Sequence, residues 1–238
     1  MRVEIMGDRA SVAEPGQLAS AIARLADSDI SVSTVSLPSD ADVLVYSRRV
    51  EDTLDAANEY CQYKNVPLVI MSTGMDEAMP TTPGYPLVMA PNTGLRVLRF
   101  LQRVEEQAKH LQGWEKHIIE HHQPSKKDVS GTAKKLAEML GLGKDEIVSV
   151  RNFEESRAHY PSMTEENVKS YAGHEVTFTN PANGDQESSD ILVLGREEYA
   201  KGLVVICKIL QLPEVKDYIA KHDNKVHIVD LLEAGFLG

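Results

Sequence analysis

Hydrophobic and polar positions divide the chain into two parts with different patterns. In the first part, short apolar runs alternate with stretches whose apolar residues recur every three or four positions, which predicts alternating strands and helices. The strands are expected at residues 3–7, 30–37, 42–46, 67–71 and 86–90, and the helices at 16–25 and 51–64. Strands linked by helices need right-handed crossovers, so we predict an α/β domain with a mostly parallel sheet, whose ligands bind beyond the carboxyl ends of the strands.

The second part begins after Asn92 and has longer helices and less regular strands. A helix is expected at 95–108, a short strand at 117–120, a polar loop at 121–130 and a helix at 132–140. Strands at 146–151, 175–178 and 191–194 follow, then helices at 197–210 and 213–221 and a strand at 226–229. Because regular helices do not separate the three middle strands, we predict a second, α+β domain with an open, mixed or antiparallel sheet. The tail returns to the first domain.

Composition narrows the class of protein. The chain has 238 residues, 42% of them hydrophobic and 26% charged, which is typical of globular proteins and excludes disordered and fibrous classes. No apolar run is long enough to span a bilayer, and the first residues show no signal-peptide pattern. The net charge, 25 − 36 = −11, argues against partners such as nucleic acid or an anionic membrane. Cys61 and Cys207 lie in apolar patterns, which predicts buried free thiols and a cytoplasmic location.

Functional side chains concentrate in residues 120–132. Ser130 is a good helix N-cap, Gly131 lets a ligand approach the backbone, and Thr132 adds a hydroxyl at the first turn. A helix N-terminus can bind a carboxylate or phosphate. The segment also contains two imidazoles and two ammonium groups, those of His121, His122, Lys126 and Lys127. It could therefore hold a small dianion and donate a proton to it, and the alternative is a solvated polar loop before a capped helix.

Three other features of the second part could be functional, namely the paired histidines, an arginine after a strand and a loop that contains a histidine and a tyrosine. Adjacent histidines in an extended segment point to opposite faces, so we expect no metal at His121 and His122. Arg151 follows a predicted strand and could meet an anion, with ordinary surface charge as the alternative. His159 and Tyr160 are expected in a loop that could cover a site.

The same segment resembles the 4-hydroxy-tetrahydrodipicolinate reductase (dihydrodipicolinate reductase) family. The family signature has Glu-x-His, three residues, Lys-x-Asp and then Ser-Gly-Thr-Ala, and residues 120–133 read EHHQPSKKDVSGTA. A single residue between the Asp and the Ser-Gly is similar to the shorter plant and cyanobacterial form. Three further segments resemble family motifs, namely 67–74 (PLVIMSTG), 90–92 (APN) and 173–176 (GHEV). The resemblance covers roughly residues 40–238.

The resemblance implies a reductase with two domains. Residues 1–93 and 196–238 would form a Rossmann-like dinucleotide-binding domain for NADPH or NADH, and residues 94–195 a domain for substrate binding and oligomerisation that builds a homotetramer. Hydride would pass from the reduced nicotinamide to an α,β-unsaturated cyclic imine dicarboxylate, as in diaminopimelate and lysine biosynthesis. Proton donation falls to His122, whose pKa cationic neighbours would lower, and substrate anchoring and protonation fall to Lys126.

The resemblance also implies two sets of binding residues. Substrate contacts are expected from Thr73, Gln123, Ser130, Gly131 and Thr132. Cofactor contacts are expected from Gly7, Arg9, Ser47, Ser72, Thr73, Gly74, Ala90 and Asn92. No metal is expected.

The N-terminal loop departs from the family pattern. Of the Gly-x-x-Gly-x-x-Gly turn only Gly7 and Gly16 remain, and Asp8 and Glu14 bring negative charge that Arg9 offsets in part. The chain is also short between the strands at 30–37 and 42–46, where a ribose-reading acid or a 2′-phosphate-reading Arg would lie, so the sequence does not choose between NADH and NADPH. Two alternatives remain open: a reductase for another cyclic imine, and a non-catalytic protein that binds dicarboxylates or regulates a partner.

Overall fold

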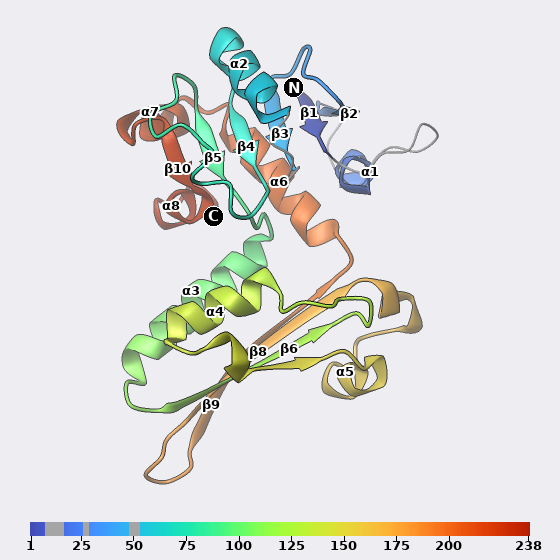
Figure 1. The fold of residues 1–238 in the computed structure, drawn as a ribbon, viewed down its shortest axis with the longest axis vertical. Helices are drawn as coiled ribbons and strands as arrows, with labels where there is room; N and C mark the ends of the chain where they lie inside the picture. Colours follow the sequence, from blue (N-terminus) through green and yellow to red (C-terminus); the bar gives the residue numbers. More distant parts are fainter. Residues whose placement is uncertain (8–16, 26–28, 48–52) are drawn as a thin grey trace. The chain divides into compact units, whose positions relative to one another are not determined.

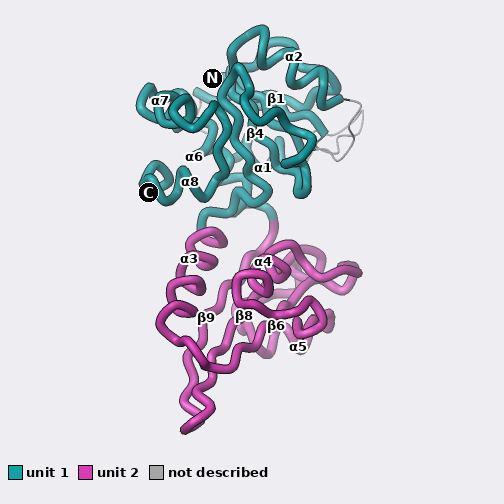
Figure 2. Tube along the Cα trace, turned by 60° about the vertical axis from the view of Figure 1, so that its left-hand side comes forward, with its two compact units in different colours: residues 1–95, 196–238 teal, residues 96–195 magenta. Residues whose placement is uncertain are grey.

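The computed structural model describes residues 1–7, 17–25, 29–47 and 53–238 of the chain. Its residues form two compact units, one made of residues 1–95 and 196–238 and the other of residues 96–195 (Figure 2).

The first unit is built on a six-stranded parallel sheet (Figure 1). The order of its strands is β10-β5-β4-β3-β1-β2, and every pairing is parallel. Its strands are β1 (Arg2–Met6), β2 (Ser31–Val35), β3 (Val43–Tyr46), β4 (Leu68–Ile70), β5 (Leu87–Met89) and β10 (Lys225–His227). β3, β4 and β5 are buried at every position, as expected for strands covered on both faces. The predicted α/β fold class is confirmed.

The order of strands reverses between β1 and β3. From β1 the chain moves outward to β2, then returns past β1 to β3 and continues through β4 and β5. The link from β2 to β3, residues 36–42, contains no helix, and the buried Glu4 carboxylate accepts hydrogen bonds from the Ser39 amide and hydroxyl, both at 2.8 Å. In open α/β sheets such a reversal marks the crevice where ligands bind. Gly7 and Ser47, which follow β1 and β3, lie at this point.

Helices complete the hydrophobic core of the first unit. They are α1 (Gln17–Leu25), α2 (Leu54–Lys64), α6 (Glu197–Ile209), α7 (Pro213–Lys221) and α8 (Ile228–Glu233). α2 buries Leu54, Ala57 and Cys61 against the apolar side chains of β3, β4 and β5, at the three- and four-residue spacing of one helix face. Cys61 and Cys207 are buried and free, as predicted, and burial raises the pKa of both thiols to about 12.

The second unit has a four-stranded mixed sheet in the order β7-β6-β8-β9. Its elements are α3 (Leu95–His110), β6 (Glu115–His122), α4 (Gly131–Leu140), β7 (Ile147–Val150), α5 (Phe153–His159), β8 (Tyr171–Thr179) and β9 (Gln186–Leu194). Two short 3-10 helices, Lys144–Glu146 and Glu165–Lys169, lie between them. β6 pairs with β7 in parallel and with β8 antiparallel, so the predicted mixed sheet is confirmed.

Three local expectations are wrong. β6 continues through His122, because its pairing with β8 keeps His121 and His122 extended, so these histidines do not lie in a loop. His159 ends helix α5, which the Asn152 side chain caps by accepting hydrogen bonds from the amides of Glu154 and Glu155. β10 ends at His227, where α8 begins, so the strand does not reach residue 229.

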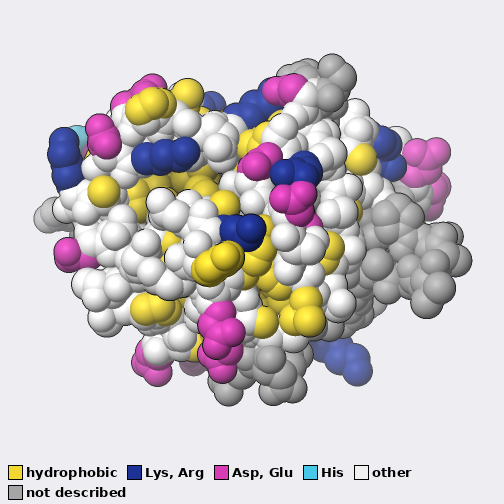
Figure 3. All heavy atoms as spheres, turned by 90° about the horizontal axis from the view of Figure 1, so that it is seen from above, with side chains coloured by type: hydrophobic (Ala, Val, Ile, Leu, Met, Phe, Trp, Pro, Cys, Tyr) yellow, Lys and Arg dark blue, Asp and Glu magenta, His cyan; other side chains and the backbone are white. Residues whose placement is uncertain are grey.

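The lengths of the helices and the distribution of surface charge bear on whether a membrane or nucleic acid could be a partner. Among the residues that the structure describes, no helix is both long and apolar enough to cross a membrane. On the face seen in Figure 3, acidic and basic side chains are interspersed, and the coloured residues of that face form no continuous basic patch.

Candidate active site

The site is built around β6, whose alternate side chains point to opposite faces of the second sheet. Glu120 and His122 lie on one face and His121 on the other. Across the ladder, Glu120 pairs with His174 of β8, so these two side chains share a face. The segment then turns through residues 123–130 into α4, whose N-cap is Ser130.

Glu120 is fully buried and is held by three hydrogen-bonding partners. Its carboxylate accepts from the Arg151 guanidinium, from the Ser130 amide at 2.9 Å and from the Ser149 hydroxyl at 2.8 Å. Burial opposes its ionisation, but the bonds from Arg151, Ser130 and Ser149 together outweigh burial and lower the pKa of Glu120 to about 2. Glu120 is therefore a buried carboxylate that stays ionised and fixes the start of α4.

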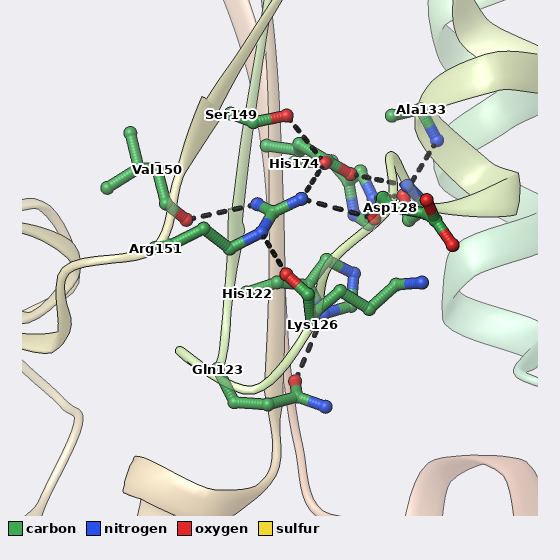
Figure 4. Close-up of polar contacts among 11 residues, drawn as sticks. His122, Gln123, Lys126, Asp128, Ala133, Ser149, Val150, Arg151 and His174 are labelled. Carbon is green, nitrogen blue, oxygen red and sulfur yellow. Dashed lines mark hydrogen bonds and ion pairs between the residues drawn. The ribbon is translucent and has the colours of Figure 1, made fainter.

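Arg151, the residue after β7, is not an isolated surface charge: its side chain is 22% exposed and pairs with Glu120. Its guanidinium contacts Glu120 and donates to the carbonyls of Lys126 at 2.9 Å, Val150 at 3.1 Å and Asp128 at 3.3 Å (Figure 4). Arg151 thus ties the 123–130 segment to the sheet, and its contact with an anion stays a prediction.

Ser130 connects α4 to the histidines. Its hydroxyl accepts from the Ala133 amide at 3.1 Å and lies 2.9 Å from Nε2 of the buried His174. The ring of His174 contacts that of His122 edge to face, with centroids 5.8 Å apart. Burial, with smaller effects of neighbouring groups, lowers the pKa of His174 to about 3, so this ring is neutral. The amide and hydroxyl of Ser130 both have partners inside the protein, and its contact with a substrate stays a prediction.

His122 is half-buried, and its Nδ1 lies 3.2 Å from Oε1 of Gln123. Its Nε2 is buried and has no hydrogen-bond partner among the described residues. Burial is the main cause that lowers the pKa of His122 below its ordinary value, and the charges of Arg151 and Lys126 act in the same direction. The expected effect of cationic neighbours is thus real but smaller than that of burial.

Lys126 and the first turn of α4 remain open to a ligand. The Lys126 side chain runs away from Arg151 (Figure 4), and its ammonium has no partner within the described ranges of the chain. The amides of Gly131 and Thr132 come first in the helix, where no intrahelical acceptor exists. A Cβ placed on Gly131 would meet nothing within 4 Å, so the backbone there is accessible. These groups together offer positive charge and donors to an anion.

The opposite face of β6 carries a second cluster of rings. His121 is buried, its Nδ1 lies 3.1 Å from the Ser156 hydroxyl, and its ring stacks on His159 at 4.9 Å. Burial, with help from His159 and Arg151, lowers the pKa of His121 to about 4. The cluster packs α5 on the sheet, and His159 also pairs with Glu175 at 3.1 Å.

Three of these side chains could also offer metal ligands. Glu120, His122 and His174 place ligand atoms within 4.8 Å of one another. Because both Glu120 oxygens already accept hydrogen bonds, from Arg151 and Ser149 on one and from Ser130 on the other, we assign no metal to this set.

The expected cofactor residues lie in the first unit, at the carboxyl ends of its strands. Gly7 has a φ of 91° and Gly74 a φ of 75°, conformations that favour glycine, and Ser47 follows β3. Thr73 and Gly74 are exposed, whereas Ser72 and Ala90 are buried. The Asn92 side chain accepts from the Gly94 amide at 2.9 Å. This edge of a parallel sheet suits a dinucleotide, and Arg9 lies outside the described residues.

Sequence reasoning missed that Arg151 and Ser149 lie at the site, where both donate hydrogen bonds to Glu120. The sequence shows Arg151 as a charge after a strand, but its partners come from β6 and from the loop that follows β6. Only the strand order brings these segments together.

The first unit is thus a parallel α/β sheet with a reversal of strand order, and the second is a mixed-sheet unit that carries a histidine, a lysine and an open helix N-terminus. The model of the family described as "Dihydrodipicolinate reductase, C-terminus" matches residues 97–223, more than half of the chain. The chain belongs to the dihydrodipicolinate reductase family, whose members are oxidoreductases of lysine biosynthesis.

Two named relatives of the chain carry the name of this family. The chain is 30% identical over 211 residues to "Probable 4-hydroxy-tetrahydrodipicolinate reductase 2, chloroplastic" of Oryza sativa subsp. japonica, covering 82% of this chain and 62% of that protein. It is 29% identical over 185 residues to 4-hydroxy-tetrahydrodipicolinate reductase 1, chloroplastic, of Arabidopsis thaliana, covering 71% of this chain and 52% of that protein. The chain thus spans about half to three fifths of these relatives.

A solved structure shows the same fold. The dipicolinate-bound dihydrodipicolinate reductase from Paenisporosarcina sp. TG-14 matches with a TM-score of 0.64 and 17% identity, over 95% of this chain and 97% of that one.

Proposed function

We propose that the protein is a reductase that converts 4-hydroxy-tetrahydrodipicolinate to tetrahydrodipicolinate: the 4-hydroxyl leaves as water, and hydride from NADPH or NADH and a proton add to the resulting cyclic unsaturated imine dicarboxylate. The observation that carries this proposal is the arrangement of His122 and Lys126 beside the open N-terminus of α4. All of these groups lie within the segment that the family model matches.

The carboxylates of the substrate would be bound by the positively charged and hydrogen-bond-donating groups of this site. The Lys126 ammonium offers a full charge, and the amides of Gly131 and Thr132 offer the partial charge of a helix N-terminus. The Thr132 hydroxyl and the Gln123 amide add donors, while Ser130 holds the turn in place. Thr73 of the first unit remains a proposed second carboxylate contact.

His122 would deliver the proton. In the free protein its lowered pKa keeps the ring mostly neutral at pH 7. A bound dianion favours the charged ring and raises this pKa, so the imidazolium forms where the substrate needs an acid. Lys126 offsets the carboxylate charge and supplies a second proton donor.

A reduced nicotinamide, when bound, would supply the hydride. The residues proposed to hold it are those at the carboxyl edge of the first sheet, namely Gly7, Ser47, Ser72, Thr73, Gly74, Ala90 and Asn92. Ala90 can contribute only its carbonyl, because its amide donates to the Ile70 carbonyl at 2.8 Å. Arg9 is kept as a proposed contact outside the described residues.

The test is a reductase assay with 4-hydroxy-tetrahydrodipicolinate and each nicotinamide, which follows the loss of the reduced cofactor's absorbance. Substrate-dependent oxidation of NADPH or NADH supports the proposal. Absence of oxidation with both cofactors, in a protein whose fold is verified by circular dichroism, would refute it.

One sequence observation favours a second candidate. The N-terminal loop keeps Gly7 and Gly16 but lacks the middle glycine of the family turn, and it carries Asp8 and Glu14. Such a loop would weaken pyrophosphate binding. The second candidate is therefore a dicarboxylate-binding or regulatory protein without turnover, and a reductase for another cyclic imine is a variant of the first. Substrate screening with several cyclic imines separates these cases.

We also propose a homotetramer, with the second unit as the oligomerisation domain. Sedimentation equilibrium measures this directly: a mass near four chains supports it, and a monomer contradicts it.

A further inference from the structure

Arg151 contacts three separate parts of the second unit at once. Its guanidinium meets Glu120 of β6, the Val150 carbonyl at the end of β7, and the carbonyls of Lys126 and Asp128 in the 123–130 segment. A guanidinium has five N–H donors in a fixed plane, so these contacts define the position of the segment as well as its distance from the sheet.

The Glu120 carboxylate extends this arrangement to the other end of the segment. Glu120 lies two residues before His122 and accepts from the amide of Ser130, where the segment ends. Ser130 in turn contacts His174, whose ring packs against that of His122. The Glu120–Arg151 pair therefore holds the segment at Ser130, where it ends, and at the carbonyls of Lys126 and Asp128 within it.

The contacts of Arg151 use its donors inside the protein. Its side chain is 22% exposed, that of Glu120 is fully buried, and its charge is matched by the Glu120 carboxylate. Lys126, by contrast, has only backbone partners among the residues that the structure describes: its amide donates to the Gln123 carbonyl at 2.9 Å and its carbonyl accepts from Arg151. Arg151 therefore positions the 123–130 segment, and Lys126 is left to bind the dicarboxylate.

We infer that Arg151 is the positioning residue of the substrate site, acting through Glu120 and the Lys126 carbonyl to set where Lys126 and the first turn of α4 meet the dicarboxylate. The inference rests on the proposed function of Lys126. It predicts that loss of the planar contacts disturbs substrate binding and turnover while nucleotide binding, in the other unit, is unchanged.

The main test compares Arg151→Lys with the matched control Arg157→Lys. Lys keeps the charge next to Glu120 but cannot reach several acceptors in one plane. Arg157 pairs with the exposed Glu165 at 2.7 Å on the surface of the same unit. We expect Arg151→Lys to lower kcat/KM by about 10- to 100-fold, with the affinity for NADPH or NADH within about twofold, because small displacements of positioning groups have effects of this size. Arg157→Lys should behave as the wild type.

A double variant separates positioning from charge compensation. Removing Arg151 alone leaves a buried carboxylate unpaired, which can unfold the unit. Glu120→Gln combined with Arg151→Met removes both charges. If Arg151 positions the segment, this double variant folds but keeps a reduced kcat/KM. Recovery of wild-type kcat/KM in the double variant would overturn the inference, because Arg151 would then only neutralise Glu120.

The rate of amide hydrogen exchange reports how firmly residues 123–130 are held, and its measurement needs no assay of function. Arg151→Lys should speed amide exchange in residues 123–130 relative to Arg157→Lys, and unchanged exchange there would also overturn the inference. If the wild type neither reduces the substrate nor binds pyridine-2,6-dicarboxylate, the proposed function fails, and the exchange result still decides whether Arg151 holds the segment.

Discussion

Lys126 and His122 lie close together but have different tasks in the proposed reaction. Lys126 presents a full positive charge with no partner in the described part of the chain, whereas His122 presents a half-buried ring that is mostly neutral in the free protein. The first is suited to bind a carboxylate and the second to release a proton once the carboxylates are bound.

Substitution of each residue should separate these tasks. Lys126→Met should weaken binding of pyridine-2,6-dicarboxylate and lower kcat/KM, while His122→Gln should lower kcat by about 10²- to 10⁴-fold, the range for loss of a general acid, with the dicarboxylate still bound. Calorimetry and steady-state kinetics measure the two effects. The exposed neighbour Lys127→Met serves as the control. Wild-type turnover in either of the first two variants would remove its assigned role.

The pH profile should report the protonation of His122. A proton donor acts in its charged form, and the pKa of His122 in the free protein lies below its ordinary value of 6.5. The value of kcat/KM should therefore be highest at pH values below this pKa and fall as the pH rises through it. The pKa seen in kcat should be higher, because bound carboxylates favour the imidazolium. A profile for kcat/KM that is identical in the wild type and His122→Gln would contradict this assignment.

At the scale of elements, β6 and α4 carry the site together. The Ser130 hydroxyl accepts from Ala133 at the start of α4 and contacts His174 of β8. Ser130→Ala removes a helix cap, and we expect it to reduce the free energy of unfolding by about 1–2 kcal/mol. Urea unfolding measures the change, and Ser125→Ala, at an exposed position in the preceding loop, is the control. An unfolding midpoint equal to that of the wild type would show that the cap is not needed.

Most elements could be predicted from the hydrophobic pattern because the apolar positions in their sequences are the positions that become buried. Val43–Tyr46 is a continuous apolar run and forms a strand buried at every position. Leu95–His110 shows the spacing of one helix face, with Val97, Phe100 and Val104 buried. Residues 130–132 could likewise be recognised as a capped helix start, since the signal is local.

The elements that sequence reasoning missed depend on contacts between distant segments. His121 and His122 are polar and read as a loop, but pairing with Gly173 and Ala172 of β8 makes them the end of a strand. α5 has seven residues, too few for a clear helical repeat, and its signal was the capping residue Asn152. The positions of Arg151 and His174 at the site follow from strand order, which depends on segments far apart in the chain and has no local sequence signal.

At the scale of the whole molecule, the proposed function divides between the two units. On this proposal the second unit would bind the dicarboxylate around Lys126 and the start of α4, and the carboxyl edge of the parallel sheet in the first unit would bind the dinucleotide. A reductase must bind both molecules in one assembled site. Binding of one should therefore affect binding of the other, since the two ligands are in contact when hydride is transferred.

Calorimetric titration with NADPH and NADH, each with and without pyridine-2,6-dicarboxylate, tests this claim most directly. The proposed reductase should bind at least one nicotinamide, and the dicarboxylate should tighten that binding. Lys126→Met should abolish the tightening without changing the affinity for the nicotinamide alone. Binding of the dicarboxylate with no binding of either nicotinamide would contradict the reductase and identify a protein that keeps the dicarboxylate site without hydride transfer.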